Sequence, residues 1–275
     1  MVKCVGRLLV LILAAALAHP AAAQTKDEFV PTVGQPGKDV VWVPSPEETV
    51  AKMMEVGRIT PQDFVIDLGS GDGRNVIAAA KLGARGLGVE YNQDMVDLSK
   101  RIATKEGVAD RAQFVQGDMF EADFSKATVL ALFLLPSNLL QLREKIFNMT
   151  PGTRVVLNTF GIQDWLPDEQ VTLDNCTSWC TVMLNVVPAK IAGTWRVNQG
   201  GELTLTQQYQ MVTGTFKTND GRSIPVTGRL RGNDLTLTAE KQQEFKGRVN
   251  GKTIDGTSQP AGGGAEQAIT FTRVN

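Results

Sequence analysis

The sequence predicts an α/β fold, in which a Rossmann-like, mainly parallel sheet with helices on both faces precedes a small all-β antiparallel meander, a barrel or a sandwich. Short apolar segments alternate with helical patterns over residues 41–187, the order typical of a parallel sheet. Over residues 191–275 helical periodicity is absent and apolar residues recur at every second position. The 275 residues suffice for both parts, and we expect the boundary near Pro188.

The elements of the first part follow from hydrophobic spacing and from the residues that interrupt it. Val50, Met53 and Met54 have close to helical spacing, and Pro61 ends that pattern. Five short apolar segments bounded by turn residues are expected to be strands. The expected helices are 46–59, 75–82, 94–106 and 136–148, and the expected strands are 64–68, 86–90, 112–116, 128–134 and 154–160.

The last part repeats two short motifs. An apolar–x–Gly–x–apolar pattern occurs at 191–195, 212–216, 226–230 and 245–249, and it alternates with segments such as LTLT at 235–238. Glycine-rich turns separate these motifs, which gives about eight short strands in a row. Glycines inside the strands would allow the sharp curvature of a small barrel.

The first 23 residues have the three-part pattern of a secretory signal. Lys3 and Arg7 precede an 11-residue apolar run at 8–18, and an alanine-rich cleavage site ends at Ala23. We therefore expect a periplasmic or secreted protein with no transmembrane segment in the mature chain, because the run is shorter than the ~20 residues that span a bilayer. An uncleaved segment would instead anchor the protein in the membrane. Residues 24–40 are expected to be a flexible lead-in.

Removal of the signal changes the available chemistry. The remaining chain has 26 basic and 29 acidic residues, a net charge of −3, and it loses His19, the single histidine. The absence of histidine excludes Ser-His-Asp and Cys-His catalysis, imidazole metal ligands and a histidine base. The chain also lacks the basic excess of a general nucleic-acid binder. We expect no metal site and no nucleic-acid partner.

Two cysteines, Cys176 and Cys180, remain in the mature chain. An oxidising compartment favours a disulfide between them. Residues four apart in an extended strand lie roughly 13 Å apart, so a bridge would require a turn. The alternative is two reduced, partly buried thiols.

The most informative segment is 65–77, where an apolar strand ends with Asp67 and three glycines follow before a helix. Gly69, Gly71 and Gly73 do not fit the G-x-G-x-x-G dinucleotide pattern, and the G-K-[ST] ending of a P-loop is absent. Glycines let a ligand approach the backbone, and the helix N-terminus offers free N–H groups to an anion. A tight turn without a ligand is the alternative.

Acidic residues also follow the next two expected strands. Glu90 ends one of them, where a carboxylate is positioned to accept hydrogen bonds from ribose hydroxyls. Asp118 and Met119 come just after the strand at 112–116. A single carboxylate is more often a solvated strand end. Three of them at successive strand ends, in register with the glycine loop, indicate a ligand site.

The order D-x-G-x-G-x-G resembles the first motif of the class I S-adenosylmethionine-dependent methyltransferases. The resemblance implies that S-adenosylmethionine is the cofactor and that Asp67 binds its amino group. It also implies that Asp118 contacts the adenine amino group and that Met119 packs on the adenine ring. The expected cofactor-binding residues are Asp67, Gly69, Gly71, Gly73, Glu90, Asp118 and Met119.

A narrower resemblance rests on the segments 42–46, 71–90, 127–146 and 151–156. These look like bacterial relatives of the lysine methyltransferases that modify the c-type ring protein of ATP synthase. The resemblance implies protein lysine as the first-choice methyl acceptor. The sequence departs from the group at Phe133, where a tyrosine is frequent. An exported setting also lacks the mitochondrial substrate.

The same resemblance supplies the catalytic candidates. It places Trp42 in a segment that covers the cofactor, and Leu135, Pro136 and Asn138 where substrates enter. The candidates are therefore Trp42, Pro136 and Asn138. Each also has a structural interpretation: Trp42 as a packing lid, Leu135 and Pro136 as the end of a buried strand, and Asn138 as a helix cap.

The leading hypothesis is an exported S-adenosylmethionine-dependent methyltransferase, a chemistry that depends on alignment of the acceptor and needs no histidine. One alternative is a non-catalytic cofactor-fold binding protein, because this cofactor is made in the cytoplasm. Another is an envelope ligand-binding module carried by the β-domain. A barrel interior lined with polar groups would favour ligand binding, and a filled apolar interior would favour a structural module.

Overall fold

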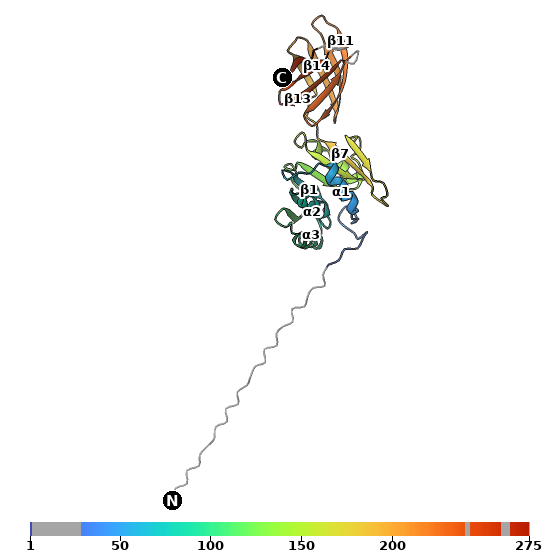
Figure 1. The fold of residues 1–275 in the computed structure, drawn as a ribbon, viewed down its shortest axis with the longest axis vertical. Helices are drawn as coiled ribbons and strands as arrows, with labels where there is room; N and C mark the ends of the chain where they lie inside the picture. Colours follow the sequence, from blue (N-terminus) through green and yellow to red (C-terminus); the bar gives the residue numbers. More distant parts are fainter. Residues whose placement is uncertain (2–28, 240–242, 260–264, 275) are drawn as a thin grey trace. The chain divides into compact units, whose positions relative to one another are not determined.

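The computed structural model describes residues 1, 29–239, 243–259 and 265–274 (Figure 1). The expected signal segment lies outside the described residues, apart from Met1. Residues 31–275 form one compact unit that contains two β-sheets. Within the described ranges, no helix is long and apolar enough to cross a membrane.

The first sheet has seven strands in the order β3-β2-β1-β4-β5-β7-β6. The first five in this order are parallel, whereas β7 runs antiparallel to both β5 and β6. The strands are β1 (Phe64–Leu68), β2 (Arg85–Glu90), β3 (Ala112–Gln116), β4 (Val129–Leu132), β5 (Arg154–Asn158), β6 (Glu169–Thr172) and β7 (Thr181–Val186). The mainly parallel sheet is confirmed, and β6 and β7 are additions that the hydrophobic pattern did not predict.

Four helices in the described part of the chain cover both faces of this sheet. They are α1 (Glu47–Val56), α2 (Arg74–Lys81), α3 (Gln93–Lys105) and α4 (Pro136–Phe147). The side of the sheet that carries Ile66 and Leu130 packs in one core with α4. The side that carries Val65 and Val129 packs in another core with α1 and α2. Because successive strand side chains point to opposite faces, apolar strands such as β4 are buried on both.

Local signals fix where the helices begin. Helix α1 starts directly after Pro46 and has two glutamates in its first turn, where they favour the helix dipole. Asn92 caps α3, since its side-chain oxygen accepts a hydrogen bond from the Asp94 amide at 2.9 Å. Helix α4 has Pro136 in its first turn. These starts place helix N-termini at the edge of the sheet where β1, β2 and β4 end.

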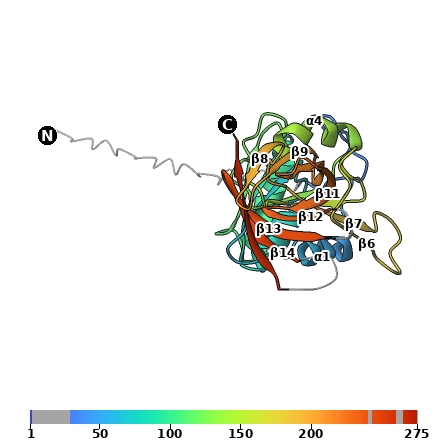
Figure 2. The ribbon, with the colours of Figure 1, turned by 90° about the horizontal axis from the view of Figure 1, so that it is seen from above.

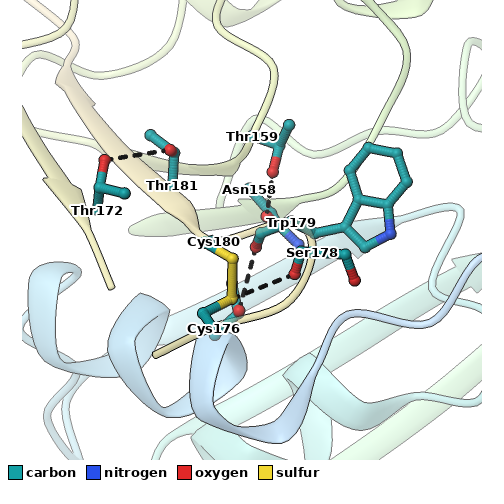
Figure 3. The surroundings of a disulfide bond; sticks show 9 residues. Asn158, Thr159, Thr172, Cys176, Ser178, Trp179, Cys180 and Thr181 are labelled. Atoms are coloured by element: carbon teal, nitrogen blue, oxygen red, sulfur yellow. Dashed lines mark hydrogen bonds between the residues drawn. A yellow bond between two sulfur atoms is a disulfide. The ribbon is translucent and has the colours of Figure 1, made fainter. Parts of the chain in front are cut away.

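Strands β6 and β7 form a hairpin whose loop carries a disulfide between Cys176 and Cys180 (Figure 3). The two Cα atoms lie 5.6 Å apart. Asn175 and Trp179 both adopt a left-handed backbone with φ of 58°. These conformations supply the turn that an extended segment lacks, so the structure has a disulfide rather than two thiols.

The second sheet is a closed antiparallel barrel (Figures 1 and 2) in the order β10-β11-β12-β13-β14-β15-β8-β9. The structure therefore has a barrel, not a sandwich. Its strands are β8 (Gly193–Val197), β9 (Glu202–Gln208), β10 (Met211–Lys217), β11 (Ser223–Arg231), β12 (Asp234–Thr238), β13 (Glu244–Asn250), β14 (Thr253–Gln259) and β15 (Gln267–Arg273).

Glycines in the middle of four strands let the barrel curve tightly. They are Gly214, Gly228, Gly247 and Gly256, and each shares the parity of the buried residues on its strand. A Cβ atom at Gly228 would lie 2.2 Å from the carbonyl oxygen of Thr236 and 2.6 Å from the Leu237 side chain. The neighbouring strand is therefore so close that only glycine fits without a shift.

The barrel interior is apolar and partly filled. Trp195, Leu205, Leu230 and Ile254 belong to its buried core. A cavity of about 310 Å³ remains, with Leu203, Phe216 and Phe271 among the side chains that line it. The interior therefore matches neither of the two simple expectations, a polar-lined ligand site or a fully filled core.

Several contacts join the first sheet to the barrel. The Ala189 amide donates to the Gly232 carbonyl at 2.8 Å. Arg229 of β11 pairs at 2.7 Å with Asp168, whose side chain is 2% exposed. Trp165 stacks on Tyr209 with ring centroids 5.2 Å apart. The two sheets thus share buried contacts in addition to the chain that connects them.

Gly228→Val is predicted to destabilise the barrel while the first sheet keeps its fold. The valine side chain would press on the backbone of β12, and overpacking of this kind costs about 1–3 kcal/mol. Thermal unfolding followed by circular dichroism should show an earlier transition for this variant. Thr227→Val, at the exposed neighbouring position, is the matched control. Equal stability of Gly228→Val and the wild type would contradict the proposed role of the glycine.

Candidate functional site

Two adjoining hollows lie at the carboxyl ends of the parallel strands. The loop hollow is lined by the glycine loop, by Asp67 and Asn75, and by residues 42–45. The outer hollow is lined by Glu90 and Asp118, by their neighbours, and by residues 35–43. Trp42, Val43, Gly69 and Phe133 line both hollows. This is the edge where open α/β sheets bind their ligands.

All three glycines of the loop have left-handed backbones, with φ of 71° at Gly69, 55° at Gly71 and 82° at Gly73. They lack side chains for different reasons. A Cβ atom at Gly73 would lie 2.5 Å from the Phe114 ring, so this glycine is required by packing. A Cβ atom at Gly71 would lie 2.7 Å from Nε1 of Trp42, which covers the loop at that point.

Asp67 and Asn75 form a buried polar pair in the loop hollow. Their side chains are linked by a hydrogen bond of 3.1 Å from Asn75 Nδ2 to Asp67 Oδ2. Burial raises the pKa of the Asp67 carboxyl well above its usual range, and the hydrogen bond from Asn75 offsets part of this effect. A buried carboxyl of this kind favours a cationic partner.

Two further polar atoms in the loop hollow are unsatisfied. Among the described residues, neither Asn75 Oδ1 nor Ser70 Oγ has a hydrogen-bond partner, although both are buried. Unpaired buried polar atoms are costly and call for a ligand or water. Together with Asp67, they fit a ligand that carries an ammonium group.

Glu90 connects the second strand to the glycine loop. Its Oε2 accepts a hydrogen bond from the Gly71 amide at 2.9 Å, and its Oε1 accepts one from the Asn92 amide at 2.9 Å. Each carboxylate oxygen can accept a further hydrogen bond. Glu90 therefore braces the loop and still offers acceptors to ligand hydroxyls in the outer hollow.

Asp118 is paired with a lysine that the sequence pattern did not single out. Lys38 Nζ lies 2.8 Å from Asp118 Oδ2, and the Phe120 amide donates to Oδ1 at 2.9 Å. The hydrogen bond from Lys38 lowers the pKa of the Asp118 carboxyl. Lys38 Nζ also lies 5.4 Å from the centroid of the Tyr91 ring. The segment before Trp42, predicted to be a lead-in, therefore lines the site.

Asn138 does not cap helix α4. The cap residue is Leu135, and no side chain caps this end of the helix. Asn138 is 2% exposed, and its Nδ2 lies 4.0 Å from the sulfur of Met119. It therefore supports Met119, while Pro136 at the start of α4 is exposed. Of the three catalytic candidates, only Trp42 lines either hollow.

Known proteins resemble this part of the chain. The sequence model of the ANTKMT methyltransferase domain matches residues 67–169. A protein-lysine N-methyltransferase of Saccharolobus islandicus is 39% identical over 151 residues, which are 54% of this chain and 94% of that protein. The chain belongs to the ANTKMT methyltransferase family. It is an S-adenosylmethionine-dependent methyltransferase, as the glycine loop and the strand-end carboxylates predicted.

Two other relatives extend the comparison to animals and to a solved structure. A lysine N-methyltransferase of Rattus norvegicus that is named for the ATP synthase C protein is 35% identical over 48% of this chain, which spans 60% of the rat enzyme. A structure described as an RNA methyltransferase from Salinibacter ruber, in complex with S-adenosyl-L-homocysteine, is 44% identical with a TM-score of 0.51. That likeness covers 54% of this chain and 96% of the other.

The orphaned atoms of the loop hollow fit the cofactor of this methyltransferase family. S-adenosylmethionine carries an ammonium group, which the buried Asp67 carboxyl and the unpaired oxygens of Asn75 and Ser70 would accept. No group of three or more potential metal ligands occurs among the described residues.

Asp67→Asn is predicted to stabilise the cofactor-free protein increasingly as pH rises from acid to neutral. The raised pKa of Asp67 means that ionisation of its carboxyl costs free energy in the folded state. This cost is absent below the carboxyl's ordinary pKa, where both states are protonated, and it grows above that pKa. Chemical denaturation at a series of pH values, with the exposed Asp97→Asn as control, measures the difference. A difference that is constant with pH would contradict the prediction.

Proposed function

We propose that this protein is exported and transfers methyl groups from S-adenosylmethionine to protein lysine. The observation that carries the acceptor class is the 39% identity to a protein-lysine N-methyltransferase over 94% of that protein's length. The Salinibacter ruber structure is described as an RNA methyltransferase. The net charge of −3 over residues 24–275 disfavours a polyanionic acceptor.

The cofactor roles follow the two hollows. In this proposal Asp67 binds the amino group of the cofactor, and the glycine loop with the N-terminus of α2 faces its carboxylate. Glu90 accepts hydrogen bonds from the ribose hydroxyls. Asp118 accepts one from the adenine amino group, in exchange for part of its contact with Lys38. Met119, buried beside Asn138, packs on the adenine ring.

The catalytic requirement on this chain is modest. The cofactor supplies a methyl group on a sulfonium, and an acceptor amine that has lost one proton forms the new C–N bond as the C–S bond breaks. The protein must hold the acceptor in line and exclude water. Desolvation lowers the pKa of a lysine amine, so an apolar acceptor site favours the neutral, reactive form. Trp42 and Pro136 remain candidates for contact with the acceptor, and Asn138 acts through Met119.

Export is proposed on two observations. The first 23 residues have the pattern of a secretory signal, with its cleavage site at Ala23. The loop between β6 and β7 carries the Cys176–Cys180 disulfide, and disulfides persist mainly in oxidising compartments. The protein is then periplasmic or secreted, or anchored to the membrane if the signal is retained.

The test combines cofactor titration with product analysis. We expect the full chain to bind S-adenosylmethionine and to produce methyl-lysine in envelope proteins, detected by mass spectrometry. Glu90→Ala should weaken cofactor binding by about one to two decades, because hydrogen bonds to a charged group contribute about 1.5–3 kcal/mol. Asp97→Ala, on the exposed face of α3, should bind like the wild type.

Two outcomes would contradict this function. Tight cofactor binding without turnover would favour the non-catalytic binding protein. Methyl groups found in RNA instead of protein would replace the acceptor class. An unchanged affinity of Glu90→Ala would remove Glu90 from the cofactor site while leaving the methyltransferase function in place.

The barrel cavity favours a second function, the binding of a small apolar molecule. The lining residues include five with large apolar side chains, Leu203, Phe216, Leu237, Phe245 and Phe271, and none of the lining residues is charged. The hydroxyl of Ser258 is engaged with the Glu244 carbonyl at 3.1 Å. The volume of about 310 Å³ lies at the lower end of typical ligand sites. The chemistry fits an uncharged hydrocarbon ligand.

A neutral naphthylamine probe would test this second function. We expect saturable binding to the full chain, with an increase in probe fluorescence. Ala239→Phe places a ring at the cavity and should weaken binding at least about tenfold, as expected when a ligand loses its space. Thr238→Phe adds the same ring at the adjacent exposed position and serves as control. Equal binding by both variants would place the probe outside the barrel.

A further inference from the structure

Three aromatic side chains from distant parts of the sequence meet next to the two hollows. Phe133 follows β4, Phe160 follows β5, and Trp179 lies in the loop between β6 and β7. The ring centroids are 6.2 Å apart for Phe133 and Phe160, 5.3 Å for Phe133 and Trp179, and 5.9 Å for Phe160 and Trp179. Each side chain is half-buried, so this aromatic cluster keeps a partly exposed surface.

The position of Phe133 links the aromatic cluster to the reaction. This residue lines both the loop hollow and the outer hollow. In the proposed function, the amino-acid end of the cofactor occupies the first hollow and the adenosine occupies the second. The sulfonium between them then lies where the hollows meet. The aromatic cluster therefore borders the place where an acceptor must approach.

Trp179 is held in the aromatic cluster by its loop. The disulfide between Cys176 and Cys180 closes the loop around it, and its own backbone is left-handed with φ of 58°. The carbonyl of Trp179 accepts a hydrogen bond from Thr49 Oγ1 of α1 at 3.1 Å. Figure 3 shows the indole pointing away from the disulfide. The loop is thus fixed on one side so that the ring projects on the other.

We propose that the aromatic cluster is the acceptor site and binds the aliphatic stem and ammonium group of a lysine side chain. Aromatic faces attract ammonium groups by cation–π interaction, and rings with no charged neighbour in the cluster also cover an alkyl stem. The disulfide positions Trp179 for this contact. The inference rests on the proposed function, since it uses the expected place of the cofactor.

A nucleic-acid base would also stack on aromatic rings, but the charge of the chain opposes it. Single-stranded RNA requires cations for its phosphates as well as rings for its bases. Residues 24–275 carry a net charge of −3. A single cationic side chain has no such requirement, and it is favoured by a negative net charge. The lysine acceptor is therefore the interpretation that we test.

The test uses small probes and the full chain loaded with S-adenosylhomocysteine. N-α-acetyl-lysine methylamide is compared with its norleucine analogue, which has a similar stem without the charge. We expect the lysine probe to bind more tightly and its methylene protons to shift upfield from the ring currents. Trp179→Ala should weaken binding about three- to thirtyfold, the range of a cation–π contact. Trp179→Phe should restore part of the loss, and Thr177→Ala in the same loop should leave binding unchanged.

The role of the disulfide is tested separately. The double variant Cys176→Ser/Cys180→Ser should lose part of the affinity for the lysine probe while its affinity for S-adenosylhomocysteine stays the same. Wild-type affinity for the probe in this variant would overturn the positioning role of the disulfide. The role of the three rings would still stand on the Trp179 variants.

The outcomes separate the two proposals. Failure to bind S-adenosylhomocysteine would overturn the proposed function. Normal binding of that molecule with equal affinity for the lysine and norleucine probes would overturn the lysine site alone. Binding of a short oligouridylate that depends on Trp179 would also overturn it, in favour of a nucleic-acid acceptor.

Discussion

The site depends on one carboxylate that joins two neighbouring strands. Glu90, at the end of β2, accepts the amide of Gly71 through one oxygen and the amide of Asn92 through the other. The first contact fixes the glycine loop after β1, and the second fixes the turn into α3. Three closely spaced glycines with left-handed backbones would otherwise be the most mobile part of the sheet edge. The brace makes them a defined cradle.

The charges at this edge are arranged around that cradle. Asp67 lies deep beneath it with a raised pKa, whereas Asp118 lies at the surface with a lowered pKa because Lys38 is beside it. The deep carboxyl favours a cation, and the outer one is already compensated. One ligand with an ammonium group at one end and a neutral hydrogen-bond donor at the other satisfies both. This asymmetry agrees with the methyltransferase family and its cofactor.

Much of the site was predictable because it follows rules that act over short distances. Apolar strands, glycine spacing and strand-end acids place Asp67, Glu90 and Asp118 at one edge without any knowledge of tertiary contacts. Lys38 was not predictable, since it meets Asp118 across 80 positions of sequence. Asn138 was misleading in a different way. Its place near the start of a helix suggested a cap, but Leu135 occupies the cap and Asn138 is buried against Met119.

The same contrast holds for the fold. The eight barrel strands were predictable from alternation and turns, and closure follows from glycines that let strands approach. Strand β6 was not, because its sequence EQVT carries one apolar residue and most of it is exposed. The aromatic cluster depends on that unpredicted hairpin. A left-handed tryptophan between two bonded cysteines has no counterpart in propensity rules, so only the folded chain reveals it.

The β6–β7 hairpin has a consequence for communication within the protein. Near its base, Asp168 and Glu169 pair with Arg229 and Arg231 of the barrel, and at its tip the loop carries Trp179. A short ladder of paired strands therefore connects the barrel wall to the aromatic cluster. Thermodynamic linkage makes any coupling through it reciprocal. A molecule in the barrel that alters affinity at the tip must have its own affinity altered by the same factor when the tip is occupied.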